Sequence, residues 1–157
     1  MLAGKDEVLD ALQKSFTGWQ ARLNGMTEAE VCALPASGGW CLKDVIGHLN
    51  AWQERSIVRL EAALAGTKPV SPDWMDGLPE EEDFLELFNQ RIYERSAAES
   101  WETVYARWQT DFARFLQLAA LVPEPDLLAQ GKYPWLEGYP LMAVLLGSLD
   151  HHNEHAE

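Results

Sequence analysis

The sequence predicts an all-α protein built as a four-helix bundle. Apolar residues recur at three- and four-residue spacing in four long stretches, which is the period of an amphipathic helix. No stretch shows the alternating pattern of a half-buried strand, and turn residues separate the helical stretches. A chain of 157 residues with 47% hydrophobic residues is long enough for a real core, so we expect residues 1–157 to form one domain.

The first half of the chain contains two long predicted helices and a short one between them. Residues 5–24 form the first long helix. Residues 27–30, Thr-Glu-Ala-Glu, are a capping box that opens a short helix, which Pro35 closes. The second long helix is predicted from about residue 42 to residue 65, because Gly66 is a typical residue at a helix end.

The second half of the chain supplies the other two long helices. Loops are predicted over 67–79, which is rich in proline and aspartate, and over 124–140. The third helix covers about 80–121, with a kink or break over 96–100, where a serine can act as an N-cap. The fourth helix begins near Pro140, because proline is tolerated in a first helical turn.

The charge and the cysteine content limit which partners and which cellular compartment we expect. The chain has 25 acidic and 12 basic residues, a net charge of −13, and such a surface repels phosphates. We therefore expect no nucleic-acid partner and no membrane partner. No secretory hydrophobic region or transmembrane run is visible, and Cys32 and Cys41 form no disulfide or metal motif. A cytoplasmic location is expected.

All four histidines lie in two of the predicted helices. His48 stands in the second long helix, and His151, His152 and His155 stand at the end of the fourth. At 100° per residue, His48 shares a face with Trp52, and the three terminal histidines occupy an arc of roughly 100° on the apolar stripe of their helix. If the two stripes face each other, three imidazoles meet, and imidazole is a common ligand of transition metals.

The same residues also have ordinary structural interpretations. His48 can be a core histidine bonded to a carboxylate or a carbonyl, and His151 and His155 can belong to a solvated helix end. His152 is expected to be exposed or to lie behind the metal ligands. Four of the seven tryptophans can form the wall of a pocket for an organic ligand, or they can be core residues: Trp40, Trp52, Trp108 and Trp135.

The motifs around these residues resemble those of a known family. Residues 39–52, GWCLKDVIGHLNAW, are similar to the W-[ST]-x-K-D-V-x-x-H-L-x-x-W signature of the ClbS/DfsB family, a branch of the DinB-like four-helix bundles. Residues 88–92 resemble its F-N element, residues 126–141 its loop before the last helix, and residues 151–155 its H-Y-x-E-H ending. These matches keep the family order and cover most of the chain.

The resemblance implies a metal site. DinB-like proteins often bind a divalent metal through one histidine of the second helix and an H-x-x-x-H pair of the fourth, which correspond here to His48, His151 and His155. Zinc or nickel suits such imidazole ligands. Because only neutral imidazole binds a metal, affinity is expected to fall as the pH drops through about 6.5. The chain departs from the family at Cys41, where a hydroxyl residue is usual, and at His152, where tyrosine is usual.

The resemblance also implies a function. Members of this branch protect cells against reactive natural products, so we expect a small-molecule ligand and detoxification by binding, neutralising or hydrolysing an electrophile. As an enzyme the protein would be a hydrolase or a transferase. Two alternatives stay open: a protein that sequesters a ligand without turnover, and a helical interaction protein, for example a homodimer, that uses no metal.

Overall fold

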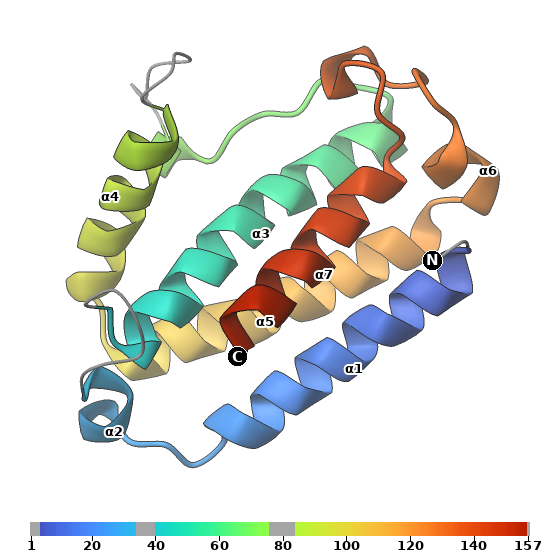
Figure 1. Ribbon diagram of the computed structural model, residues 1–157. Coiled ribbons are helices and arrows are strands. Elements are labelled where there is room, and N and C mark those ends of the chain that lie inside the picture. Colours follow the sequence, from blue (N-terminus) through green and yellow to red (C-terminus); the bar gives the residue numbers. More distant parts are fainter. Residues whose placement is uncertain (1–3, 34–39, 76–83, 157) are drawn as a thin grey trace.

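The all-α prediction is confirmed by the structure, a computed structural model that describes residues 4–33, 40–75 and 84–156. No β-strand occurs in these ranges. Four long helices form the bundle (Figure 1): α1 (Lys5–Leu23), α3 (Leu42–Ala65), α5 (Trp101–Leu121) and α7 (Met142–Ala156). Helix α3 contacts α5 on one side and α7 on the other, and α1 contacts both α5 and α7 across the bundle. A further helix, α4 (Phe84–Ala97), packs on the outer side of α3.

The helix ends follow the signals in the sequence. Helix α2 (Glu28–Cys32) begins with the predicted capping box, in which Thr27 accepts the N–H of Glu30 at 3.2 Å and Glu30 accepts the N–H of Thr27 at 3.1 Å. Helix α3 ends where it was predicted to end, because Gly66 adopts the left-handed conformation with φ of 72°.

The predicted third helix is divided into two. Helix α4 ends at Ala97, and Ser100 caps α5 by accepting the N–H of Thr103 at 3.2 Å. The expected break near 96–100 is therefore a complete separation of two helices. The predicted start of this helix near Glu80 lies outside the described residues.

The two predicted loops contain short helical turns that the sequence did not predict. The turn η1 (Asp73–Met75) lies in the first loop, and α6 (Glu124–Leu128) and η2 (Pro134–Leu136) lie in the second. Both α6 and η2 carry a proline in their first positions, where its fixed φ favours a helical turn.

A buried polar network connects α3 to α5 on the side of α3 that faces away from α7. Asn50 is fully buried; it donates to Asp111 at 2.7 Å and accepts from Arg107 at 2.8 Å. Arg107 also makes two hydrogen bonds to Glu99, at 2.6 and 2.8 Å. Because Asn50 is two residues from His48, about 200° around the helix, this network turns His48 away from α5.

Helices α3 and α4 approach each other closely at Gly47. A Cβ atom at this position would lie 2.0 Å from Oγ of Ser96 and 2.8 Å from its Cβ. We predict that Gly47→Ala lowers the free energy of unfolding by about 1–3 kcal/mol, because α4 must move away or Ser96 must leave its rotamer. Denaturant unfolding followed by circular dichroism measures this change.

The matched control for that substitution is Gly18→Ala in α1. A Cβ at Gly18 meets nothing within 4 Å. Alanine there should stabilise the helix by about 0.5–1 kcal/mol, since only the backbone entropy changes. Equal stabilisation by both substitutions would contradict the close approach of α3 and α4.

Candidate functional site

Three histidines from two helices meet where α3 and α7 lie side by side. One nitrogen of each of His48, His151 and His155 lies within 4.8 Å of the others. The Nε2 atoms of His48 and His151 are 2.9 Å apart and share a hydrogen bond. His151 and His155 are one turn apart on α7, so both rings point towards α3.

A hydrogen bond between α3 and α7 holds the three histidines close together. Gln53 of α3 contacts the hydroxyl of Ser148 on α7 through its amide nitrogen at 2.9 Å, and both side chains are buried. Ser148 precedes His151 by three residues, almost one turn, and Gln53 follows His48 by five. The bond therefore fixes the position of α7 along the axis of α3, and this position brings the imidazoles together.

Burial keeps two of these imidazoles neutral. Removal from water, together with the neighbouring His151 and His155, lowers the pKa of His48 to about 3. Burial, with the charge of His155, lowers the pKa of His151 to about 4. Protonation of these two side chains therefore competes with metal binding only well below the pH of about 6.5 that an ordinary histidine would give.

The three histidines are suited to bind a metal rather than to act as general bases. None of the hydrogen bonds in the described part of the chain joins these three histidines to a carboxylate, and Nδ1 of His48 is buried without a partner. A histidine that acts as a general base needs a pKa near the working pH, usually helped by a carboxylate. Neutral nitrogens that converge on one point can instead hold a cation.

Two of the four predicted pocket tryptophans lie beside the triad. The ring of Trp40 is 5.0 Å from that of His48, and the ring of Trp52 is 6.4 Å from it. Trp52 is held by Phe88 of α4 at 4.5 Å and by a hydrogen bond to Asn89 at 3.2 Å. These aromatic rings remove His48 from water, which accounts for its low pKa.

The other two tryptophans lie elsewhere. Trp108 is fully buried in the core between α1, α5 and α7, where Phe16 and Phe112 surround it. It does not line a ligand pocket, because its face of α5 points into the bundle. Trp135 belongs to the turn η2 and lines a hollow that adjoins the α3–α7 groove, since Arg55 and Arg59 line both.

His152 was expected to be exposed or to lie behind the metal ligands, and the structure places it in the core. Its Nδ1 donates to the backbone carbonyl of Ser148 at 2.9 Å, and its Nε2 accepts from the indole of Trp108 at 3.3 Å. Both ring nitrogens are occupied, so His152 offers no metal ligand. The residue before it, His151, points the other way because one residue advances 100° around the helix.

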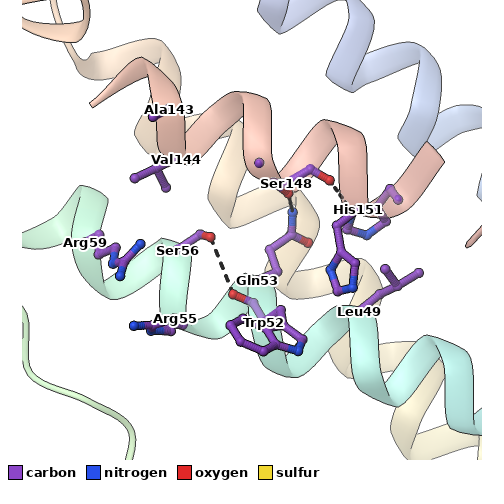
Figure 2. Close-up of a pocket in the computed structure, with 12 residues that line it drawn as sticks. Leu49, Trp52, Gln53, Arg55, Ser56, Arg59, Ala143, Val144, Ser148 and His151 are labelled. Atoms are coloured by element: carbon purple, nitrogen blue, oxygen red, sulfur yellow. Dashed lines mark hydrogen bonds between the residues drawn. The ribbon is translucent and has the colours of Figure 1, made fainter. Parts of the chain in front are cut away.

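Beside the triad lies a groove between α3 and α7 with a cavity of about 320 Å³, which His151 is the one triad member to line (Figure 2). His151 lies at one end, and the wall of α3 continues along Trp52, Arg55 and Arg59. Sequence reasoning missed Arg59 and Gln53. The i, i+4 spacing of the two arginines was the available signal for Arg59.

Three other ionisable side chains of α3 and α7 have structural roles or face solvent. Asp44 accepts the N–H of Cys41 at 3.0 Å and so caps α3, and Lys43 donates to the carbonyl of Glu99 at 2.6 Å. Glu154 is exposed. None of the helices in the described part of the chain combines the length and the apolar character needed to cross a bilayer.

The fold and the triad define a DinB-like bundle, and the sequence supports this assignment. Residues 5–157 match the DinB superfamily, so the chain belongs to that superfamily. No curated relative matches the sequence.

Solved structures of the same fold cover nearly all of the chain. The Sibling Lethal Factor precursor DfsB has a TM-score of 0.81 at 13% identity, covering 99% of this chain and 92% of DfsB. The colibactin self-resistance protein ClbS, in complex with double-stranded DNA, has a TM-score of 0.77 at 14% identity, with 99% and 92% covered. An uncharacterised Escherichia coli UTI89 protein has 0.76 at 20%, with 99% and 91% covered. The predicted resemblance to ClbS/DfsB is confirmed in the fold.

One expectation about partners was wrong. The net charge of −13 led to the exclusion of nucleic acid, yet ClbS, which has this fold, is solved with a DNA duplex bound. Net charge describes the average field around a protein, whereas binding depends on the charges of one surface. A nucleic-acid partner is compatible with this fold.

The buried His152 predicts a particular dependence of stability on pH. Burial, opposed in part by the hydrogen bond to Ser148, lowers its pKa from 6.5 to about 4. A lowered pKa means that the unfolded chain binds the proton more readily, so the contribution to stability is complete above pH 6.5 and is lost as the pH falls towards 4. His152→Phe removes this titration.

We expect His152→Phe to melt below the wild type at neutral pH, because the indole of Trp108 loses its acceptor. The difference in melting temperature should shrink as the pH falls towards 4, since only the wild type loses the histidine contribution. Thermal melts across this range measure it. Parallel melting curves for the two proteins would show that His152 does not titrate as the structure implies.

Proposed function

We propose that the protein binds a reactive small molecule in the groove between α3 and α7 and neutralises it, with a divalent metal held by His48, His151 and His155. The observation that carries this proposal is the convergence of three imidazole nitrogens within 4.8 Å beside an open groove. The triad alone offers a cation site, and the groove offers space for a ligand next to it.

The residues present fit a metal. Two ligands about 2.0–2.1 Å from one zinc ion lie roughly 2.9–3.4 Å apart, and the Nε2 atoms of His48 and His151 are 2.9 Å apart. The low pKa values of these two histidines keep their lone pairs available at neutral pH. Three protein ligands leave coordination positions open, which is the pattern of catalytic rather than structural zinc sites.

A metal held by these three histidines would supply Lewis-acid chemistry, which lowers the pKa of a water or thiol. The protein supplies the rest of the site. Trp40 and Trp52 exclude water from His48, and Trp52 also lines the groove, where it presents an apolar face to a ligand. The bond between Gln53 and Ser148 holds α7 in place, so His151 and His155 keep their positions during binding.

The substrate class is inferred from the fold relatives and from the groove. ClbS is described as a colibactin self-resistance protein, and a shared fold by itself does not transfer its activity. The groove combines apolar side chains, among them Leu49, Trp52 and Val144, with polar ones that include two arginines and two serines, and such a lining suits an organic molecule with polar groups. Hydrolysis or group transfer on an electrophile is the chemistry that a metal-activated water or thiol would perform.

A non-catalytic alternative also has support. The partner that usually orients a metal-bound imidazole is missing at Nδ1 of His48, among the residues described. A protein that only sequesters its ligand needs the groove and the tryptophans but no turnover. Ligand binding without product formation by the metal-loaded protein would favour this alternative.

We predict that zinc binds the protein and that His48→Ala and His155→Ala each weaken it by about 100-fold or more. Zinc-binding free energies of roughly 10–16 kcal/mol in structural sites are shared by about four ligands, so the loss of one is large. Isothermal titration calorimetry on protein without an affinity tag measures the affinities.

His152→Phe is the matched control, because it removes a histidine of the same helix whose two nitrogens are already occupied. Its zinc affinity should stay within a few-fold of that of the wild type. Equal affinities of His48→Ala, His155→Ala and the wild type would exclude this triad as the metal site.

A further inference from the structure

Two arginines lie in the groove beyond the histidine triad. Arg55 and Arg59 are one turn apart on α3, and both line the groove that His151 borders. Side chains at this spacing share one face of a helix, so their guanidinium groups belong to the same wall. Figure 2 shows them on α3 beyond Trp52, on the side away from His151. We call Arg55 and Arg59 the arginine pair.

The arginine pair consists of two like charges that are both partly removed from water. Burial lowers the pKa of Arg59, and burial together with the charge of Arg59 lowers the pKa of Arg55 to about 10. No ion pair among the described residues involves Arg59, although Glu137 lines the adjoining hollow together with both arginines. Two partly desolvated like charges raise each other's energy, and an anion between them relieves this repulsion.

The amino-acid composition makes the lack of an ion pair at Arg59, among the described residues, informative about its role. The chain has 25 acidic residues and only 12 basic ones, so carboxylate partners are abundant. Arg107, Arg95 and Arg114 each pair with a glutamate. Arg59 is placed instead on the wall of a cavity. A charge that serves only solubility would lie on the exposed surface, where water solvates it.

We propose that the groove binds an amphipathic organic anion, with its carboxylate, sulfonate or phosphate group on the arginine pair. Guanidinium groups bind such oxyanions with paired hydrogen bonds. The apolar body of the ligand lies along Trp52 and Val144, towards His151. Arg55 and Arg59 are seven and eleven residues from His48, roughly 10 and 16 Å along the helix, which is the length of a drug-sized molecule.

Gln53 supplies a further polar contact between the two ends of the groove. Its side chain is 2% exposed and lines the cavity. One of its two amide atoms contacts Ser148 at 2.9 Å, and the other has no partner in the described structure. Whichever way the amide is turned, one polar atom is left unpaired, which is costly when buried. A polar group in the middle of the ligand would satisfy it.

This inference deepens the proposed function in one respect only. The reactive end of the ligand reaches the triad if the proposed metal chemistry is correct, whereas binding of the anionic end depends on the arginine pair alone. The two ideas can therefore fail separately. A ligand with an anionic group at one end and a reactive group about 10–16 Å away is the substrate class that the groove selects.

A pair of fluorescent probes tests the anion site. Anilinonaphthalene sulfonate carries a sulfonate on an apolar ring system, and N-phenylnaphthylamine is the same ring system without the charge. We expect Arg59→Gln to weaken the sulfonate probe by about tenfold or more, since one charge-assisted contact is lost. The neutral probe should bind both proteins equally. Fluorescence titration gives both affinities.

The matched control is Arg114→Gln, which makes the same change of net charge at an exposed site on α5. It should leave both probes unaffected. His48→Ala should also retain sulfonate binding, so failure of the metal proposal stays distinguishable from failure of this one. If Arg59→Gln does not fold, competition by inorganic sulfate in the wild type replaces it, and sulfate should displace only the sulfonate probe.

Three results would overturn the proposal. The first is an equal loss of both probes in Arg59→Gln, which would mean that the arginine acts through packing. The second is no loss of either probe. The third is displacement of the sulfonate probe by a short DNA duplex that depends on Arg59, which would assign the arginine pair to nucleic-acid phosphate instead of a small molecule.

Discussion

The rotation of α3 about its own axis is the constraint on which the rest of the site depends. Asn50 joins α3 to Asp111 and Arg107 of α5 inside the protein, where an unpaired polar group would be costly. This network allows one orientation of the helix. At 100° per residue, the same orientation places His48, Trp52, Arg55 and Arg59 within an arc of about 60°, along the side of α3 that borders the groove.

The surroundings of the histidines then decide their chemistry. His48 and His152 have the same ring and lie in the same bundle, but their partners differ. Both nitrogens of His152 are engaged by Trp108 and Ser148, so this residue is part of the core. His48 is enclosed by tryptophans, and among the described residues its ring makes a hydrogen bond only to the imidazole of His151, while its Nδ1 is buried without a partner. A neutral, desolvated and incompletely bonded imidazole is suited to a metal.

Sequence reasoning predicted the helices and the histidine cluster because both depend on local sequence patterns. Helical periodicity, the Thr27 capping box and Gly66 defined α1 to α3, and the face of His48 followed from its spacing to Trp52. The separation of α4 from α5, the core position of Trp108 and the role of His152 depend on contacts between distant segments. Periodicity shows that a residue faces inward, but it cannot tell a core from a groove. The role of Arg59 was missed for the same reason, since one arginine on a helix usually indicates solvent.

X-ray absorption spectroscopy of the zinc-loaded protein tests the central claim most directly, because it identifies the atoms bound to the metal without requiring activity. If the triad is the metal site, the first shell contains about three imidazole nitrogens at roughly 2.0–2.1 Å, with the outer-shell scattering of histidine rings and one or more lighter oxygen ligands. The same spectrum should persist when Cys32 and Cys41 are both replaced by serine. A sulfur ligand at about 2.3 Å, or a shell of oxygen atoms without imidazole scattering, would contradict the account.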